Sequence, residues 1–176
     1  MKDFKSLVNS RQSCRDFNGE QVTKEEIDKV LEIARLSPSA CNSQPWKVYV
    51  AISPEKCKEV AKTLQDRGRN KFVDNATCFV AVAEKPRPLK PEIADRIRID
   101  HFMKYDIGEY VAYFTLAAKE LGLETCIIGW IKHDELKEVL NMPNDQICNL
   151  VIAVGKSTCE IREKKRLEIS DTVKFL

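Results

Sequence analysis

The sequence lacks the cysteine spacing that metal and redox motifs require. Its seven cysteines, none closer than eleven positions to the next, are Cys14, Cys41, Cys57, Cys78, Cys126, Cys148 and Cys159. A zinc ribbon or a thioredoxin-like motif needs two cysteines a few residues apart, because one turn of chain must present both sulfurs to one centre. Only two histidines, His101 and His133, could supplement them. We therefore expect no structural metal.

Long hydrophobic runs are also absent. The longest, such as residues 78–83, have about six residues, far fewer than the roughly twenty that span a bilayer. The first twenty residues contain no apolar run longer than two, so no signal peptide is expected. Free thiols without an export signal are typical of a cytoplasmic protein with no membrane partner.

Neither sign of charge dominates. The chain has 29 Lys and Arg against 27 Asp and Glu, a formal net charge of +2. A basic field over the whole fold would need a larger excess, so no nucleic-acid partner is expected. No Ser-His-Asp or paired-carboxylate signature appears either.

Enough apolar material is present for one core. Hydrophobic residues make up 43% of 176 residues, with no internal repeat and no low-complexity segment. A chain of this length buries about 70% of its unfolded surface on folding. We expect a single domain over residues 1–176.

The order of predicted elements indicates an α+β fold. Thr23 and Glu26 match a capping box, Pro38 should end that helix near Ser37, and Gly122 suits a helix C-terminus. Helices are expected at 4–8, 23–37, from 53 onward, 93–121 with a break near His101, and 134–140; strands at 46–52, 77–83, 125–128 and 147–154; and a proline-rich loop at 84–91. We expect a mainly antiparallel central sheet with helices on both faces.

Three segments carry polar residues that a core does not need. In the first, residues 11–15, Arg11 and Arg15 flank Ser13. Guanidinium groups and a hydroxyl suit a phosphate, although a solvated helix end with scattered charge is the alternative. The tail has a second basic cluster, Lys164 and Arg166, which would point the same way on an extended backbone and could meet the same phosphate. Alone it would be an exposed basic stretch.

The third segment is 38–46, P-S-A-C-N-S-Q-P-W. Its two prolines fix a non-helical path, and Ser39, Asn42 and Gln44 supply hydroxyl and amide groups. Such a loop can hydrogen-bond a flat heterocycle, or it can be a connection whose side chains satisfy their own backbone.

Together these segments resemble the nitroreductase family of flavin enzymes. The pattern R-x-S-x-R near the N-terminus, P-S-x-x-N-x-Q-P-W before the first strand, L-G-L followed by I-G-W, and a basic pair before R-L occur in the family's order. The resemblance spans about the whole chain, and residues 38–46 are its most specific part. It implies a nitroreductase-like fold and an intertwined homodimer with FMN at the subunit interface.

The resemblance also implies roles for individual residues. Those that would hold the phosphate and ribityl end of FMN are Arg11, Ser13, Lys164 and Arg166. Arg15 would lie near the N1/O2 edge, where a cation stabilises the anionic reduced flavin. The backbone amide of Gly129 would face N5, with Ile128 against the ring, and Ser39 and Asn42 would reach the flavin from the partner subunit. Gln44 and Trp46 would support the loop.

Some positions depart from the family pattern. Gln12 stands where a second arginine is common, and Ala40 where a second serine is. A further flavin-contacting residue is expected among Arg69, Asn70 and Lys71. Cys14 and Cys41 are interpreted as ordinary small residues, with redox-sensitive thiols as the alternative.

The implied function is an FMN-dependent oxidoreductase that passes hydride from NAD(P)H through flavin N5 to an aromatic or quinone-type acceptor, including nitroaromatics, by a ping-pong mechanism. No side chain has to act as acid or base, because the flavin carries the chemistry. The alternatives are a related flavoenzyme for reductive dehalogenation or ene-reduction, and a flavin-binding module without turnover.

Overall fold

A four-stranded antiparallel sheet lies at the centre, with the strands in the order β1-β2-β4-β3. The computed structural model describes residues 3–85 and 102–176. The strands are β1 (Trp46–Ala51), β2 (Cys78–Glu84), β3 (Glu124–Ile128) and β4 (Ile147–Gly155); the helices are α1 (Phe4–Ser10), α2 (Lys24–Ala34), α3 (Pro54–Thr63), α5 (Met103–Glu120), α6 (His133–Val139) and α7 (Ile169–Thr172); the 3-10 turns are η1 (Ala40–Asn42) and η2 (Lys71–Asn75).

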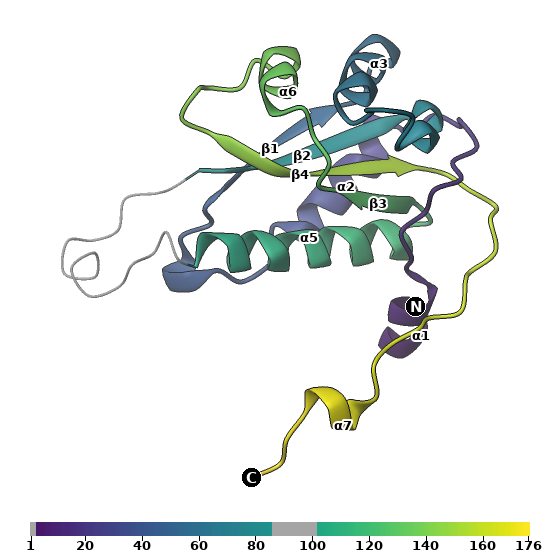
Figure 1. Cartoon of the computed structure of the whole chain (residues 1–176), viewed down its shortest axis with the longest axis vertical. Helices are drawn as coiled ribbons and strands as arrows, with labels where there is room; N and C mark the ends of the chain where they lie inside the picture. The colour runs from purple at the N-terminus through teal and green to yellow at the C-terminus, as the bar shows by residue number, and fades with distance from the viewer. Residues whose placement is uncertain (1–2, 86–101) are drawn as a thin grey trace.

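Helices cover both faces of the sheet, as Figure 1 shows. Side chains alternate between the faces of a strand, so Phe79 and Ala81 of β2 pack in the cluster that includes residues of α3 and α6. Val80 and Val82 pack on the opposite face, with residues of α2 and α5. All of β2 is buried, as expected for a central strand. The predicted α+β fold with a mainly antiparallel sheet is confirmed.

The long helix α5 runs along the lower face of the sheet in Figure 1. It buries Val111, Phe114 and Ala118 but leaves Tyr113 exposed, so the predicted burial holds for one side of the helix. Gly122 follows it with a φ of +84°. The amides of Gly122 and Leu123 donate to the carbonyls of Lys119 and Ala118, at 3.2 and 2.8 Å, which is the Schellman arrangement. Gly122 thus ends the helix as predicted.

Some predicted boundaries differ from the structure. α2 has its capping box but ends at Ala34, because residues 35–37 tighten into a turn in which the amide of Ser37 donates to the carbonyl of Ala34 at 3.1 Å. Glu84, placed in the proline-rich loop, belongs to β2. The short elements η1, η2 and α7 were not predicted. Residues 86–91 of that loop and the helix expected over 93–101 lie outside the described residues.

The C-terminal tail leaves the body after β4. In Figure 1 it passes close to α1 and then stands away from the sheet with α7. Its apolar side chains are largely exposed; they are Leu167, Ile169, Val173, Phe175 and Leu176. Exposed apolar groups in such a row are typical of a surface that another chain covers.

Candidate functional site

The N-terminal segment and the tail meet in an open, positively charged pocket of about 380 Å³. Its lining, which we call the cationic cradle, consists of Arg11, Gln12, Ser13, Arg15, Arg162, Glu163, Lys164, Lys165 and Arg166. Ser13 forms a parallel bridge with Thr125 of β3, and the amide of Cys14 donates to the carbonyl of Thr125 at 2.9 Å. The sheet edge therefore fixes the N-terminal half of the cradle. The structure brings both predicted basic elements together.

Gln12 fastens the tail to this segment. Its side chain is 7% exposed. The Oε1 atom accepts from the amide and from Nε of Arg162, at 3.1 and 3.2 Å, while Nε2 donates to the carbonyl of Glu160 at 3.0 Å. Gln12 stands where the family pattern often has an arginine. It therefore gives the cradle a neutral amide whose oxygen and nitrogen are both hydrogen-bonded.

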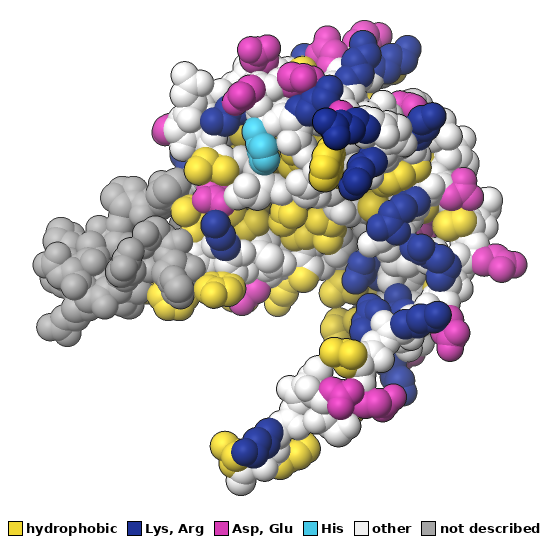
Figure 2. All heavy atoms as spheres, in the orientation of Figure 1, with side chains coloured by type: hydrophobic (Ala, Val, Ile, Leu, Met, Phe, Trp, Pro, Cys, Tyr) yellow, Lys and Arg dark blue, Asp and Glu magenta, His cyan; other side chains and the backbone are white. Residues whose placement is uncertain are grey.

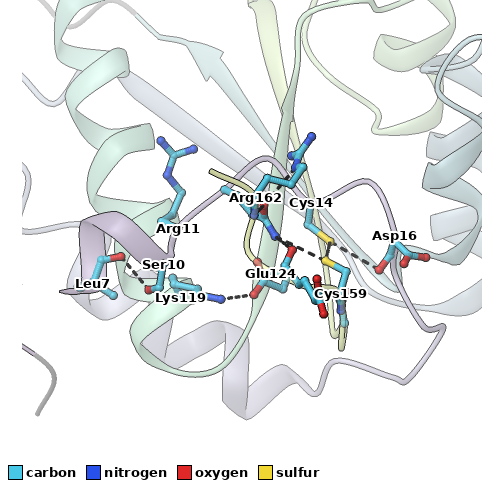
Figure 3. A network of polar contacts seen from close by, with 12 residues as sticks. Leu7, Ser10, Arg11, Cys14, Asp16, Lys119, Glu124, Cys159 and Arg162 are labelled. Atoms are coloured by element: carbon cyan, nitrogen blue, oxygen red, sulfur yellow. Dashed lines mark hydrogen bonds and ion pairs between the residues drawn. The ribbon is translucent and has the colours of Figure 1, made fainter. Parts of the chain in front are cut away.

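Two tail cations donate to backbone oxygens of the N-terminal segment. Arg162 Nη2 donates to the carbonyl of Ser13 at 2.6 Å, and Lys164 Nζ to that of Arg11 at 2.5 Å. Close by, Lys119 of α5 pairs with Glu124 of β3 (Figure 3). Sequence reasoning missed Arg162, and the only signal was its place two residues before Lys164.

The cradle is suited to an anion. Desolvation lowers the pKa of Lys164 from its ordinary value, and the neighbouring Arg11, Arg166 and Arg162 lower it further. Cations that repel one another across an open pocket are stabilised when a phosphate enters. Figure 2 shows Lys and Arg side chains gathered along the side of the molecule where the tail leaves the body. The residues present therefore fit the phosphate of a nucleotide-type cofactor.

The 38–45 loop has an unusual backbone. Cys41, Asn42 and Gln44 have φ values of 53°, 51° and 46°, in a region that residues other than glycine seldom adopt. Ser39 Oγ accepts from the amide of Gln44 at 3.0 Å, and Gln44 Nε2 donates to Asn42 Oδ1 at 3.1 Å. Gln44 therefore supports the loop, as predicted. Backbone strain of this kind collects at functional sites.

Unpartnered polar atoms also collect around this loop. Within residues 3–85 and 102–176, the buried side-chain atoms without a hydrogen-bond partner are Ser37 Oγ, Ser43 Oγ and Asp106 Oδ2. The other carboxylate oxygen of Asp106 accepts from the amide of Ala40 at 3.0 Å. Buried polar atoms are nearly always paired in a complete assembly, and these three atoms have no partner among the described residues.

The loop and the cradle lie at opposite ends of α5 (Figure 1). The loop bonds to Asp106 in the first turn, and Lys119 in the last turn is one of the charges that act on Lys164. These two helix positions are separated by about 20 Å along the axis. One chain therefore does not bring Ser39 and Asn42 to Arg11 and Lys164.

Gly129 and Ile128 lie where β3 ends. Ile128 is 5% exposed and packs in the core, whereas Gly129 is exposed. A Cβ on Gly129 would meet only the carbonyl of Asn149, at 3.8 Å, so its backbone is accessible to a ligand. The next residue, Trp130, is 47% exposed.

Of the three candidates around residue 70, Arg69 contacts Trp130, the residue after Gly129. Its guanidinium carbon is 4.6 Å from the centre of the Trp130 ring, a cation–π contact. Asn70 Nδ2 donates to the carbonyl of Leu64 at 2.9 Å, so that side chain holds its own turn. Lys71 is exposed at the start of η2.

The described residues contain neither a cluster of metal ligands nor a membrane-spanning helix. No three His, Cys, Asp or Glu side chains converge there as metal ligands. No helix among these residues is long and apolar enough to cross a bilayer.

An antiparallel sheet between helix layers, with a phosphate-type cradle where the tail meets the N-terminal segment, defines a nucleotide-cofactor protein of α+β class. The family model described as "Nitroreductase family" matches residues 8–67 and 51–156. The chain therefore belongs to the nitroreductase family, and so is an oxidoreductase.

Individual relatives agree with this membership. A Bacillus subtilis protein assigned as an NAD(P)H nitroreductase, YdgI, is 37% identical over 97% of this chain and 96% of its own length. The oxygen-insensitive NADPH nitroreductase of Helicobacter acinonychis is 28% identical over 98% and 96%. A crystal structure from Exiguobacterium sibiricum 255-15, described as a nitroreductase in complex with FMN, superposes with a TM-score of 0.88 at 22% identity, covering 100% of this chain and 98% of that one.

Proposed function

We propose that this protein is a cytoplasmic, homodimeric, FMN-dependent oxidoreductase that passes hydride from NAD(P)H to an aromatic or quinone-type acceptor, including nitroaromatics. The observation that carries the proposal is the cationic cradle, where Arg11 and Lys164 meet although they are 153 positions apart. Relatives named for NADPH-dependent nitroreduction and a fold neighbour described with FMN support it.

The chain's residues bind and orient the cofactor. Arg11, Lys164 and Arg166 hold its phosphate with charge-assisted hydrogen bonds, to which Ser13 adds a hydroxyl. Arg15, which also lines the cradle, would stabilise the negative charge that the flavin gains on reduction. The exposed backbone of Gly129 would be offered to the hydride-accepting atom, and the buried Ile128 would support this end of β3. FMN, when bound, supplies the hydride chemistry itself.

A second copy of the chain completes the site. Because the 38–45 loop and the cradle lie at opposite ends of α5, two α5 helices packed antiparallel would bring the loop of one chain to the cradle of the other. Ser39 and Asn42 would then reach the cofactor from the partner. The oxygens of Ser43 and Asp106 that have no partner among the described residues support such an arrangement, since a second chain could supply hydrogen-bonding groups to them.

Removal of two cradle cations tests the phosphate assignment. We expect Arg11→Ala with Arg166→Ala to purify largely without flavin, because each charge-assisted bond is worth about 1.5–3 kcal/mol. The absorption spectrum of the desalted protein measures occupancy. Arg35→Ala is the matched control, since Arg35 and Glu32 form an exposed ion pair at the end of α2. Full FMN occupancy in the double variant would contradict the proposal.

Anaerobic addition of NADPH or NADH tests the reaction. The wild-type flavin absorbance should bleach and return when a nitroaromatic or a quinone is added. A flavin spectrum that persists with both donors would contradict the proposed electron donor. Turnover on a halophenol alone would replace the acceptor class with reductive dehalogenation.

A further inference from the structure

Two cysteines far apart in sequence face each other beside the cationic cradle. The sulfur atoms of Cys14 and Cys159, 145 positions apart, lie 3.9 Å from each other, and Figure 3 shows the two side chains pointing toward one another. Cys14 belongs to the N-terminal segment and is buried, while Cys159 lies in the tail and is half-buried. Both thiols are free, and the proposed reaction uses neither of them.

The two sulfurs differ in how firmly they are held. The Cys14 backbone is bonded to β3 through the carbonyl of Thr125 at 2.9 Å. Cys159 lies in a stretch without helix or strand, where its amide donates to Ser157 Oγ at 3.0 Å and its sulfur receives Gln12 Nε2 at 3.6 Å. A disulfide needs the sulfurs about 2.05 Å apart. Because Cys159 lies in a segment without helix or strand, it can move toward Cys14 and close the remaining distance between the sulfurs.

We propose that Cys14 and Cys159 are a modification site: peroxide joins them in a disulfide, and the bond fastens the tail to the N-terminal segment, so that the two halves of the cationic cradle are covalently linked. The disulfide itself does not depend on the cofactor. Its effect on FMN rests on the proposed function.

Cys159 is the sulfur that reacts first, because it is the more accessible. Its thiolate attacks one oxygen of hydrogen peroxide; the O–O bond breaks, hydroxide leaves and takes a proton to form water, and Cys159 becomes a sulfenic acid. Cys14 then attacks the Cys159 sulfur as a thiolate. The S–S bond forms, the S–O bond breaks, and the departing hydroxide takes the Cys14 proton. Two thiols and one peroxide thus give one disulfide and two waters.

The order of attack agrees with the surroundings of Cys14. Burial raises the pKa of the Cys14 thiol, which makes it a poor first nucleophile. Once Cys159 is oxidised, the two sulfurs are already adjacent, so intramolecular attack is favoured over reaction with a second peroxide.

The bond would act on both halves of the cradle. Cys14 lies between Ser13 and Arg15, and Cys159 precedes Arg162 and Lys164 by a few residues. At present the halves are joined through hydrogen bonds of Gln12, Arg162 and Lys164. A covalent link beside these bonds suppresses separation of the tail from the N-terminal segment, and an FMN held between them leaves more slowly.

Peptide mapping tests the disulfide. The FMN-loaded protein is treated with hydrogen peroxide, alkylated and digested. We expect a peptide that links Cys14 to Cys159, a loss of two titratable thiols per chain, and full reversal by dithiothreitol. The linked peptide should be absent from Cys159→Ser and from Cys14→Ala, and present in Cys41→Ser, which removes an exposed thiol. Two free sulfurs, a sulfinic acid on an unlinked Cys159, or a link to another cysteine would overturn the proposal.

Trypsin cleavage after the basic residues of the tail and the release of FMN then test the latch; the cleavage sites are Arg162, Lys164, Lys165 and Arg166. In the oxidised wild type we expect both to slow severalfold, and in Cys159→Ser peroxide should change neither. Equal cleavage rates with and without the link would overturn the latch. A chain that retains no FMN in either redox state would refute the proposed function, and in that case the linked peptide and the cleavage rate still decide this inference.

Discussion

Burial divides the seven cysteines into two groups. Cys41 is exposed and Cys159 half-buried, and the other five are buried. Desolvation raises the pKa of Cys57 and of Cys148 to about 11. At pH 8 such a thiol is ionised in only about one molecule in a thousand, and the thiolate is the reactive form. Low accessibility and weak ionisation therefore both lower the reactivity of the buried thiols.

Thiol titration with a chromogenic disulfide reagent at pH 8 should report these groups. We expect Cys41 to react fast and Cys159 more slowly. Attack by the adjacent Cys14 on the Cys159 mixed disulfide should release a second equivalent of chromophore in the slow phase, and the other four buried thiols should react only after denaturant is added. Cys41→Ser should remove the fast phase and leave the slow one. Rapid reaction of all seven thiols in the native protein would contradict the burial described here.

The raised pKa values of Cys57 and Cys148 predict how the free energy of unfolding depends on pH. Their folded-state pKa lies above the ordinary value of about 8.5, so the unfolded chain loses these protons first as the pH rises. The stabilising contribution is complete below about pH 8.5 and is lost as the pH approaches 11. Urea midpoints measured between pH 8 and 10.5 should fall, and Cys148→Ala should reduce the slope. A midpoint independent of pH in this range would exclude the effect.

Gln12 illustrates which part of the site could be predicted from sequence. The basic residues around it indicate a phosphate site by type alone, and Arg11, Ser13 and Lys164 lie together in the structure. Gln12 itself looks like a weakened position, because nothing local shows its partner. That partner, Arg162, is 150 positions away in a tail without periodicity. Contacts of this range are set by the tertiary fold.

At the scale of the element, the end of α5 depends on the left-handed backbone of Gly122. A side chain there is strained, although a Cβ would meet nothing within 4 Å. We expect Gly122→Ala to lower the free energy of unfolding by about 1 kcal/mol, measured by urea denaturation. Gly122→Asn should cost less, because asparagine tolerates this backbone region better. If the wild type, Gly122→Ala and Gly122→Asn had equal free energies of unfolding, the left-handed backbone at this position would not limit the choice of residue.

Elements with a strong local signal were predicted, and those without one were not. Thr23 and Glu26 form the predicted capping box of α2, and the apolar run of β2 gives a buried strand. The turns η1 and η2 and the helix α7 are too short for periodicity to reveal them. In η1, Cys41 takes a positive φ that its residue type disfavours, so only the surrounding fold explains it.

At the scale of the whole molecule, the exposed apolar tail predicts self-association. Deletion of residues 167–176 removes Leu167, Ile169, Val173 and Phe175 but keeps Lys164 and Arg166. If the full chain is the proposed dimer, we expect the shortened chain to sediment as a monomer at the same concentration, because buried apolar area drives such association. Lys174→Ala, which keeps the apolar residues, is the control and should remain dimeric.

A shortened chain that still sedimented as a dimer would show that the tail is not the main interface and would leave the proposed packing of α5 against α5 in that role. Tyr113, on the exposed side of α5, would then be the residue to substitute.

The separation of the 38–45 loop from the cradle by the length of α5 has a consequence for the cell. If each flavin needs one group from each of two chains, loading becomes second order in polypeptide. A newly made chain would bind flavin only after it associates with a second chain. At low expression the flavin-loaded fraction would therefore fall faster than the amount of protein. Dissociation of the dimer and release of the cofactor would then be coupled in a single equilibrium. Added free flavin would stabilise the dimer, as a higher concentration of the chain would.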